Sequence, residues 1–170
     1  MVSGVGQNPG VAKLSDLSLK NRLFMATYRY RRLDPVPWAV PSKPLALARV
    51  ALVTTGAVYA PGQPPFDEEL RGGDFSFREI GSEVDVQTLG IAHKSDAFDQ
   101  EGFQRDRNLG FPLDRLREMQ GRGEIGELNH RHLSFMGSIT APGRLMSDTA
   151  PKAAELLAAD GVDVALLVPL

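Results

Sequence analysis

The apolar stretch at residues 161–170, with the sequence GVDVALLVPL, constrains the fold more than any other part of this chain. A short apolar run that follows a glycine is typical of a strand buried in a parallel sheet. In open α/β sheets, ligands and reactive groups gather just past the carboxyl ends of the strands. The sequence therefore predicts that chemistry is located at residue 170 or directly after it.

A second apolar run, ARVALVTTG at residues 48–56, predicts another buried strand. A helix is expected at residues 150–160, with Thr149 as its N-cap, Pro151 in its first turn and Gly161 as its terminator. A helix between strands is typical of a mostly parallel sheet. We therefore expect an α/β fold, Rossmann-like or flavodoxin-like, with helices on both faces of the sheet in three layers.

The remaining segments fit one domain at residues 13–170 behind a flexible start at residues 1–12. Four prolines make residues 34–44 an extended connector, which Trp38 is expected to anchor. The other predicted elements are a helix at residues 14–32, a strand at residues 75–80, a strand or extended piece at residues 84–91, a helix that opens at residues 111–112 and ends at Gly121 or Gly123, and a strand that begins at His132.

Composition narrows the class of protein. A net charge of -2 gives no reason to expect nucleic acid or an anionic membrane as partner. No apolar run approaches the ~18 residues of a membrane helix, and the first ten residues lack the pattern of a signal peptide, so a cytoplasmic protein is expected. With no cysteine, the residues given contain no disulfide, thiolate zinc site or thiol nucleophile.

The end of the first apolar run carries candidate ligand-binding residues. Thr54, Thr55 and Gly56 place two hydroxyls and a flexible backbone where such sheets bind substrates. The alternative is that Gly56 only permits a tight turn.

The segment at residues 93–108 is polar and irregular, as loops that carry function often are. On a strand, His130 and His132 would point the same way, and with Asp96 or Asp99 they could bind a metal. No spacing of a known zinc class supports this, so no metal site is expected. An acid–base role for His93 or His132 and a purely structural role both remain open.

Several blocks resemble the glycine/sarcosine/betaine/D-proline reductase selenoprotein B family, and in particular its short single-domain members. They run in collinear order over about residues 50–170: LVTTG at 52–56, QPPFD at 63–67, GDFSFREI at 73–80, IAH at 91–93, DRN at 106–108, FPLDRL at 111–116, GEIG at 123–126, RH at 131–132, SFMG at 134–137, TAP at 149–151 and DGVD at 160–163.

The resemblance implies a redox selenocysteine or cysteine directly after Leu170, so that the chain would be incomplete at an in-frame UGA codon read as a stop. It implies reductive C–N cleavage of an amino acid or betaine-like substrate. A partner subunit with a pyruvoyl group would activate the substrate, a dithiol would regenerate the selenol, and the residues given would hold no cofactor. His93 and His132 would protonate the leaving amine or hold the selenolate, while Asp106 and Asn108 would orient the substrate or the loop.

Two other functions remain open: a general thiol or selenol redox protein acting on peroxides or electrophiles, and a non-catalytic binding module. If a strand and a helix that should flank the terminal strand are missing, apolar surface is left exposed. We therefore also expect the chain to be marginally soluble or to associate with itself.

Overall fold

The computed structural model describes residues 15, 17–28, 32, 34–37, 39–95 and 99–170. Its contacts divide the chain into two compact units, residues 1–39 and 40–170, and the boundary falls inside the proline-rich segment. The expectations for residues 1–12, for Trp38 and for Asp96 fall outside the described residues. A single domain that begins at residue 13 stays a prediction.

The described part of the first unit holds one α-helix, α1 (Leu19–Thr27), which is shorter than the helix predicted from the apolar spacing. The Ser18 hydroxyl caps it by accepting a hydrogen bond from the Asn21 amide over 3.3 Å. At the other end Tyr28 is already extended. No α1 residue is buried, which explains why spacing alone misplaced its ends.

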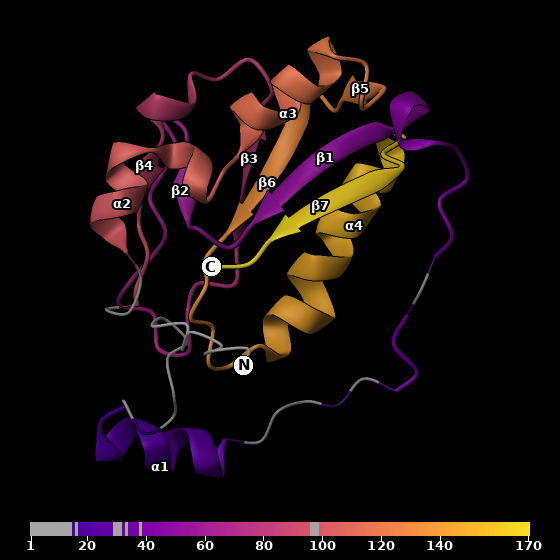
Figure 1. The fold of residues 1–170 in the computed structure, drawn as a ribbon. Coiled ribbons are helices and arrows are strands. Elements are labelled where there is room, and N and C mark those ends of the chain that lie inside the picture. The colour runs from indigo at the N-terminus through magenta and orange to yellow at the C-terminus, as the bar shows by residue number, and fades with distance from the viewer. Residues whose placement is uncertain (1–14, 16, 29–31, 33, 38, 96–98) are drawn as a thin grey trace, which may run out of the picture. The chain divides into compact units, whose positions relative to one another are not determined.

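The second unit is built on a mixed, mostly parallel sheet, as the sequence predicts (Figure 1). β1 (Arg49–Thr54) pairs in parallel with β7 (Val164–Val168) on one side and with β5 (Glu127–Leu128) and β6 (Arg131–Phe135) on the other. The one antiparallel strand of this sheet among the described residues, β3 (Phe77–Gly81), pairs with β6. A small separate pair joins β2 (Val58–Tyr59) to β4 (Gly90–Ile91).

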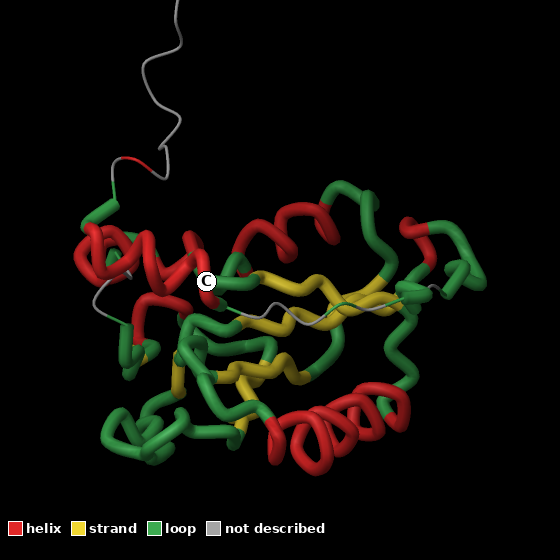
Figure 2. The backbone as a smooth tube through the Cα atoms, turned by 90° about the horizontal axis from the view of Figure 1, so that it is seen from below, coloured by secondary structure: helices red, strands yellow, loops and turns green. Residues whose placement is uncertain are grey.

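Helices lie on both sides of these strands (Figure 2). On one face, α4 (Ala150–Ala159) buries Ala153 and Leu157 in a cluster with Ala51 and Leu133 of the sheet. The other face holds a larger core, which includes Leu52, Ile80, Phe103 and Leu116 from the sheet, α2 (Gln100–Arg105) and α3 (Leu113–Gly121), together with Phe111 from the turn before α3. The α/β fold expected from the sequence is therefore confirmed.

The start of α4 differs from its prediction. The chain is already helical before Ala150, in the π-helical turn η5 (Leu145–Thr149), so Thr149 lies inside a helix and does not cap one. Its hydroxyl instead donates to the Phe75 carbonyl over 2.6 Å, which ties the helix to the loop before β3. The predicted end is confirmed: Gly161 has a φ of +73° and stops the helix.

The polar segment at residues 93–108 is more regular than the sequence suggests. It contains α2, capped by the Asp99 carboxylate, and the 3-10 turn η4 (Arg107–Leu109). The piece predicted as extended at residues 84–91 holds the 3-10 turn η3 (Val86–Thr88) and β4. A further turn, η2 (Leu45–Leu47), precedes β1. Such short turns carry no apolar period and therefore leave no sequence signal.

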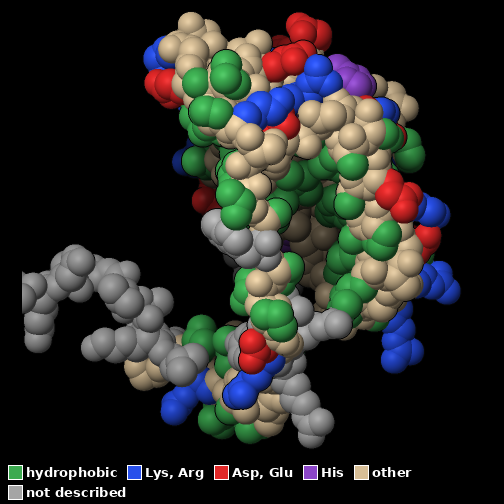
Figure 3. All heavy atoms as spheres, turned by 90° about the vertical axis from the view of Figure 1, so that its right-hand side faces the viewer, with side chains coloured by type: hydrophobic (Ala, Val, Ile, Leu, Met, Phe, Trp, Pro, Cys, Tyr) green, Lys and Arg blue, Asp and Glu red, His purple; other side chains and the backbone are tan. Residues whose placement is uncertain are grey.

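β7 is the strand least covered by the described residues, among which it pairs only with β1. An apolar groove of about 410 Å³ runs between it and α4, and Leu167 beside it is 67% exposed. Figure 3 views this side and shows hydrophobic side chains around a hollow. Within the described part of the chain, none of the helices combines the length and apolarity that crossing a bilayer requires.

Candidate functional site

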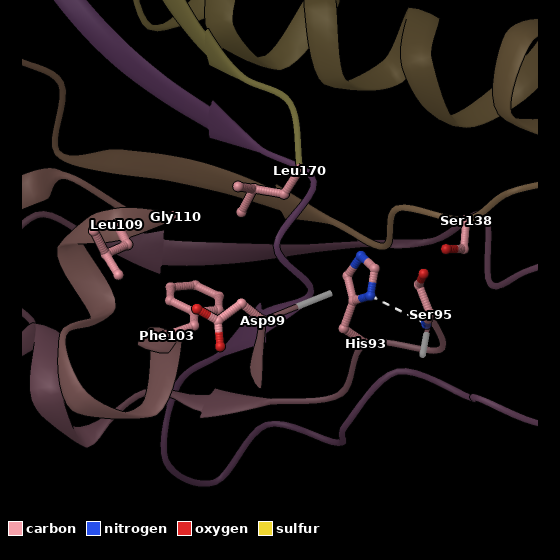
Figure 4. Close-up of a pocket in the computed structure, with 8 residues that line it drawn as sticks. All are labelled: His93, Ser95, Asp99, Phe103, Leu109, Gly110, Ser138 and Leu170. Atoms are coloured by element: carbon pink, nitrogen blue, oxygen red, sulfur yellow. Dashed lines mark hydrogen bonds between the residues drawn. The ribbon is translucent and has the colours of Figure 1, made fainter. Parts of the chain in front are cut away.

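A pocket of about 320 Å³ opens at the carboxyl edge of the parallel strands (Figure 4). Its lining comes from the ends of β6 and β7, from the turn before α3 and from the segment that joins β4 to α2. The lining residues are His93, Ser95, Asp99, Phe103, Leu109, Gly110, Ser138 and Leu170. This is the edge at which α/β sheets bind ligands, so the pocket lies where the sequence predicts chemistry.

His93 is the buried titratable group of this pocket, with only 4% of its surface exposed. Its Nδ1 accepts a hydrogen bond from the Ser95 amide over 3.2 Å, the dashed line in Figure 4. Burial lowers the pKa of His93 below its ordinary value of 6.5, so the ring is neutral at pH 7. Because the accepting Nδ1 carries no proton, the neutral ring carries its proton on Nε2.

Gly137 lets the His93 ring approach the end of β7. A Cβ at this position would lie 2.6 Å from Nε2 of His93 and 3.0 Å from the main-chain oxygen of Leu170. It would also lie 3.2 Å from the Thr55 carbonyl oxygen. A larger residue would displace these groups, so the glycine brings the imidazole together with the ends of two parallel strands.

The predicted substrate-binding residues at the end of β1 organise this edge. Thr54 Oγ1 donates to the Gly110 carbonyl over 2.6 Å and accepts from the Gly56 amide over 3.0 Å. Thr55 Oγ1 instead accepts from the Leu170 amide over 2.8 Å. The two hydroxyls thus fix the pocket wall and the end of β7, while their direct contact with a substrate stays a prediction.

The side chain of Leu170 fills the space between two glycines. A Cβ on Gly56 would lie 2.9 Å from Leu170 Cδ1, and a Cβ on Gly110 would lie 2.5 Å from it. The Phe103 ring lies against both glycines and closes this side of the pocket. Gly56 therefore serves a close approach as well as a turn.

Asp106 and Asn108 do not line the pocket. Asp106 Oδ1 accepts from the Asn108 amide over 2.9 Å, and this hydrogen bond lowers the pKa of the Asp106 carboxyl. The Asn108 side chain donates to Asp114 Oδ2 over 2.9 Å and accepts from the Asp114 amide over 3.1 Å. Asp106 therefore caps η4 and Asn108 holds η4 against α3, and through η4 they position Leu109 and Gly110.

His132 lies inside the sheet, fully buried, and is not among the residues that line the pocket. Its Nδ1 accepts from the Leu52 amide of the neighbouring strand over 3.0 Å, and the Phe111 ring meets it edge-on at 6.2 Å. Burial lowers the pKa of His132 to about 4, with a smaller contribution from Arg117. The structure therefore does not bring His93 and His132 into one pocket, and a catalytic role for His132 stays a prediction.

The condition under which His130 and His132 would point the same way, that both lie on one strand, is not met. β6 begins at Arg131, which leaves His130 outside the strand with a 65% exposed side chain. Its Nε2 lies 3.9 Å from the Asp160 carboxylate. Within the described ranges, no group of three or more histidine and acidic side chains could hold a metal ion.

Sequence reasoning missed Phe103, Gly110 and Ser138 of the pocket lining. Ser138 adopts a φ of +54°, a conformation that non-glycine residues rarely adopt and that often marks a functional turn. The sequence holds one weak signal for it, since it follows Gly137 directly after a strand. Asp99 was noticed only as a metal candidate, whereas its Oδ1 accepts from the Gly102 amide to cap α2.

Fold and pocket together define an α/β domain with a pocket at the carboxyl edge of its sheet. The sequence model of the family described as glycine/sarcosine/betaine reductase selenoprotein B (GRDB) matches residues 8–169. The chain therefore belongs to this family, as the resemblance of its blocks indicates.

Its relatives include subunits of several reductases. The chain is 31% identical over 154 residues to D-proline reductase subunit gamma of Acetoanaerobium sticklandii, covering 91% of this chain and 61% of the relative. It is 27% identical over 157 residues to glycine reductase complex component B subunit gamma of Carboxydothermus hydrogenoformans, covering 92% and 35%. With sarcosine reductase complex component B subunit beta of Peptoclostridium acidaminophilum it shares 26% identity over 125 residues, covering 74% and 29%. The chain thus spans less than two thirds of these relatives, and no solved structure matches it at a significant level.

Proposed function

We propose that this chain is part of a reductase subunit that acts in a complex to cleave a C–N bond reductively in an amino acid or betaine-like substrate. The observation that carries the proposal is the family match over residues 8–169, with relatives named as subunits of D-proline, glycine and sarcosine reductases. The pocket that encloses His93 at the carboxyl edge of the sheet supports it.

The proposed reaction needs a two-electron donor. The C–N bond breaks and the carbon gains a hydrogen. The nitrogen leaves as an amine, after protonation in an amino acid and directly in a betaine, where it is already quaternary. A selenol and a thiol are oxidised together to a selenenylsulfide, or two thiols to a disulfide, and a dithiol reductant restores them. The residues given hold no cysteine, so the proposal assigns the selenol or thiol to a residue directly after Leu170.

His93 suits the task of holding a selenolate or thiolate. A neutral ring with its proton on Nε2 can donate a hydrogen bond, and this nitrogen lies beside the main chain of Leu170. A hydrogen bond to an anion is about twice as strong as one between neutral groups. A neutral imidazole is a poor acid, so this arrangement favours holding the anion over protonating the leaving amine.

A partner subunit with a pyruvoyl group completes the proposal. Its carbonyl would supply the electrophile that activates the substrate amine. In this chain, Thr55 would hold the end of β7 and Gly137 would leave room for the His93 ring, so that both stay in place while the activated substrate reacts.

The nucleotides after the Leu170 codon provide the first test. We expect an in-frame UGA followed by an open frame that encodes a cysteine-containing segment, or a cysteine codon at this position. A UAA or UAG stop followed by non-coding sequence would overturn the assignment of the redox residue.

Activity provides the second test. The full reading frame, produced with the subunits encoded beside it, should reduce one of D-proline, glycine, sarcosine or betaine with dithiothreitol as donor. His93→Gln should lower kcat about 100-fold or more, as loss of a group that stabilises a reacting anion does. His130→Gln, a change at an exposed histidine outside the pocket, should leave kcat unchanged. Turnover of peroxide alone would favour the general redox protein, and no turnover at all would favour the binding module.

A further inference from the structure

We infer that a second pocket, formed by residues 70–73, 75 and 141–144, binds a small carboxylate that carries an apolar body. The pocket has a volume of about 480 Å³ and lies wholly within the unit of residues 40–170. It shares no lining residue with the His93 pocket. The inference does not rest on the proposed function.

Two guanidinium groups give this pocket its charge. Arg71 and Arg144 both line it, and both residues are exposed. Among the residues that the structure describes, neither guanidinium forms an ion pair or a hydrogen bond, and no acidic residue lines the pocket. Lys94 adds a cation at the edge, where its Nζ donates to the Leu70 carbonyl over 3.1 Å. Arginine binds carboxylates in a bidentate geometry, so an oxyanion fits this charge.

The walls of the pocket are apolar, which points to a ligand with more than a charged group. Leu70, Phe75, Ala141 and Pro142 are the apolar side chains that line it. The Arg144 guanidinium lies 5.2 Å from the centre of the Phe75 ring, a cation–π contact that holds it over the pocket. Inorganic phosphate would leave the apolar walls unused, whereas a carboxylate on a small apolar body would cover them.

The pocket is built by close packing of its two loops. The Ala141 amide donates to the Gly72 carbonyl over 3.1 Å. Gly72 and Gly73 have φ values of +93° and +95°, and a Cβ on Gly72 would lie 2.7 Å from the Ala141 Cβ. A Cβ on Gly73 would lie 2.9 Å from Ile139 Cα. Only glycine permits this approach, and the packed loops form the cavity before a ligand arrives. Little binding free energy is therefore lost in ordering the loops.

Calorimetric titration of the whole 170-residue chain tests the inference, with benzoate as the probe. Benzylamine has the same apolar body with the opposite charge, while acetate and inorganic phosphate supply the oxyanion without the ring. We expect saturable benzoate binding that weakens as sodium chloride is raised, weaker binding of acetate and phosphate, and none of benzylamine.

Single substitutions locate the binding. Arg71→Gln and Arg144→Gln should each raise the Kd for benzoate about ten-fold or more, the loss of a charge-assisted hydrogen bond. Arg115→Gln, a matched change at an exposed arginine of α3, should leave the Kd unchanged, and circular dichroism should report the same fold for all three. The absence of benzoate binding would overturn the inference. So would benzylamine binding as tightly as benzoate, phosphate binding more tightly than benzoate, or equal losses in all three variants. Turnover is not measured, so a failure here is distinct from a failure of the proposed function.

Discussion

The Thr55 hydroxyl forms two hydrogen bonds with the main chain of Leu170, accepting from its amide over 2.8 Å and donating to its oxygen over 3.3 Å. The Thr55 amide also donates to the Val168 carbonyl over 3.1 Å. One side chain at the end of β1 therefore fixes the direction in which the chain leaves β7. This contact would therefore set the direction of a residue that follows Leu170.

Thr55→Val is expected to lower the free energy of unfolding by about 1–2 kcal/mol, because two hydrogen bonds are lost and no space is opened. Urea denaturation measures the change. Thr55→Ser keeps the hydroxyl and serves as the control, with an expected loss well below that of the valine variant. Equal stabilities of the valine variant and the unmodified protein would contradict the contact.

Gly137→Ala is expected to push the His93 ring out of place, since the added methyl would lie 2.6 Å from Nε2. We predict a changed pKa for His93 in an NMR titration and a loss of about 1–3 kcal/mol in stability from overpacking. Gly121→Ala, at the end of α3 with nothing within 4 Å of the added methyl, should leave the pKa of His93 unchanged and should not lower the stability, since alanine has the higher helix propensity. An unchanged His93 titration in the Gly137 variant would refute the close approach.

Burial of His132 makes stability depend on pH. The folded protein lowers the pKa of His132 to about 4, from an ordinary value of 6.5. As the pH falls, the unfolded chain therefore binds the proton before the folded protein does. Stability contributed by the neutral ring is complete above pH 6.5, is lost between pH 6.5 and 4, and levels off below. The loss amounts to about 3 kcal/mol.

Urea denaturation between pH 7.5 and 4.5 measures this slope. His132→Gln should flatten it, leaving the smaller part that His93 contributes in the same direction. His130→Gln, at an exposed ring, should keep the full slope. A slope unaffected by His132→Gln would show that another group causes it.

Leu167→Lys is expected to reduce self-association of the chain. The leucine lies beside the apolar groove between β7 and α4 and is 67% exposed, and exposed apolar patches of this kind promote association. Sedimentation velocity at increasing concentration measures the effect, with Leu47→Lys, a leucine 68% exposed before β1, as the matched control. Monomeric behaviour of the unmodified chain at all concentrations would contradict the prediction.

β1 and β7 could be predicted because each is a short, nearly continuous run of apolar residues in the sequence. β1 and β7 fall within the two apolar runs, and Gly161 ends the helix between them as expected. α2 could not be predicted, since Phe103 is the one buried residue in its six and one apolar position has no period. The sequence signal for α2 is the capping carboxylate of Asp99, which the sequence analysis considers only as a possible metal ligand.

A pocket lies at the edge of the sheet where the sequence predicts chemistry, but most of the residues that line it could not be predicted. His93 lies in the pocket, while His132 supplies a hydrogen-bond acceptor inside the sheet, and sequence alone cannot tell these uses of an imidazole apart. Asp106 and Asn108 do not face the pocket. The Asp106 carboxylate and the Asn108 side-chain amide form hydrogen bonds with neighbouring groups of the same polar segment and of α3. Phe103 and Gly110 line the pocket because the fold brings them against Leu170, which is distant from both in sequence. A sequence pattern cannot show this contact.

The position of β1 in the sheet also determines when the domain can form during synthesis. Thr54 pairs with Val168, 114 residues further along the chain, and the other neighbours of β1 are contributed by residues 127–135. The ribosome must therefore release almost the whole unit before its central strand has both partners. Until β7 is available, the apolar strand β1 lacks its partner on that side. Pairing between residues so distant in sequence slows folding. A growing chain of this kind depends on protection from aggregation until β7 emerges.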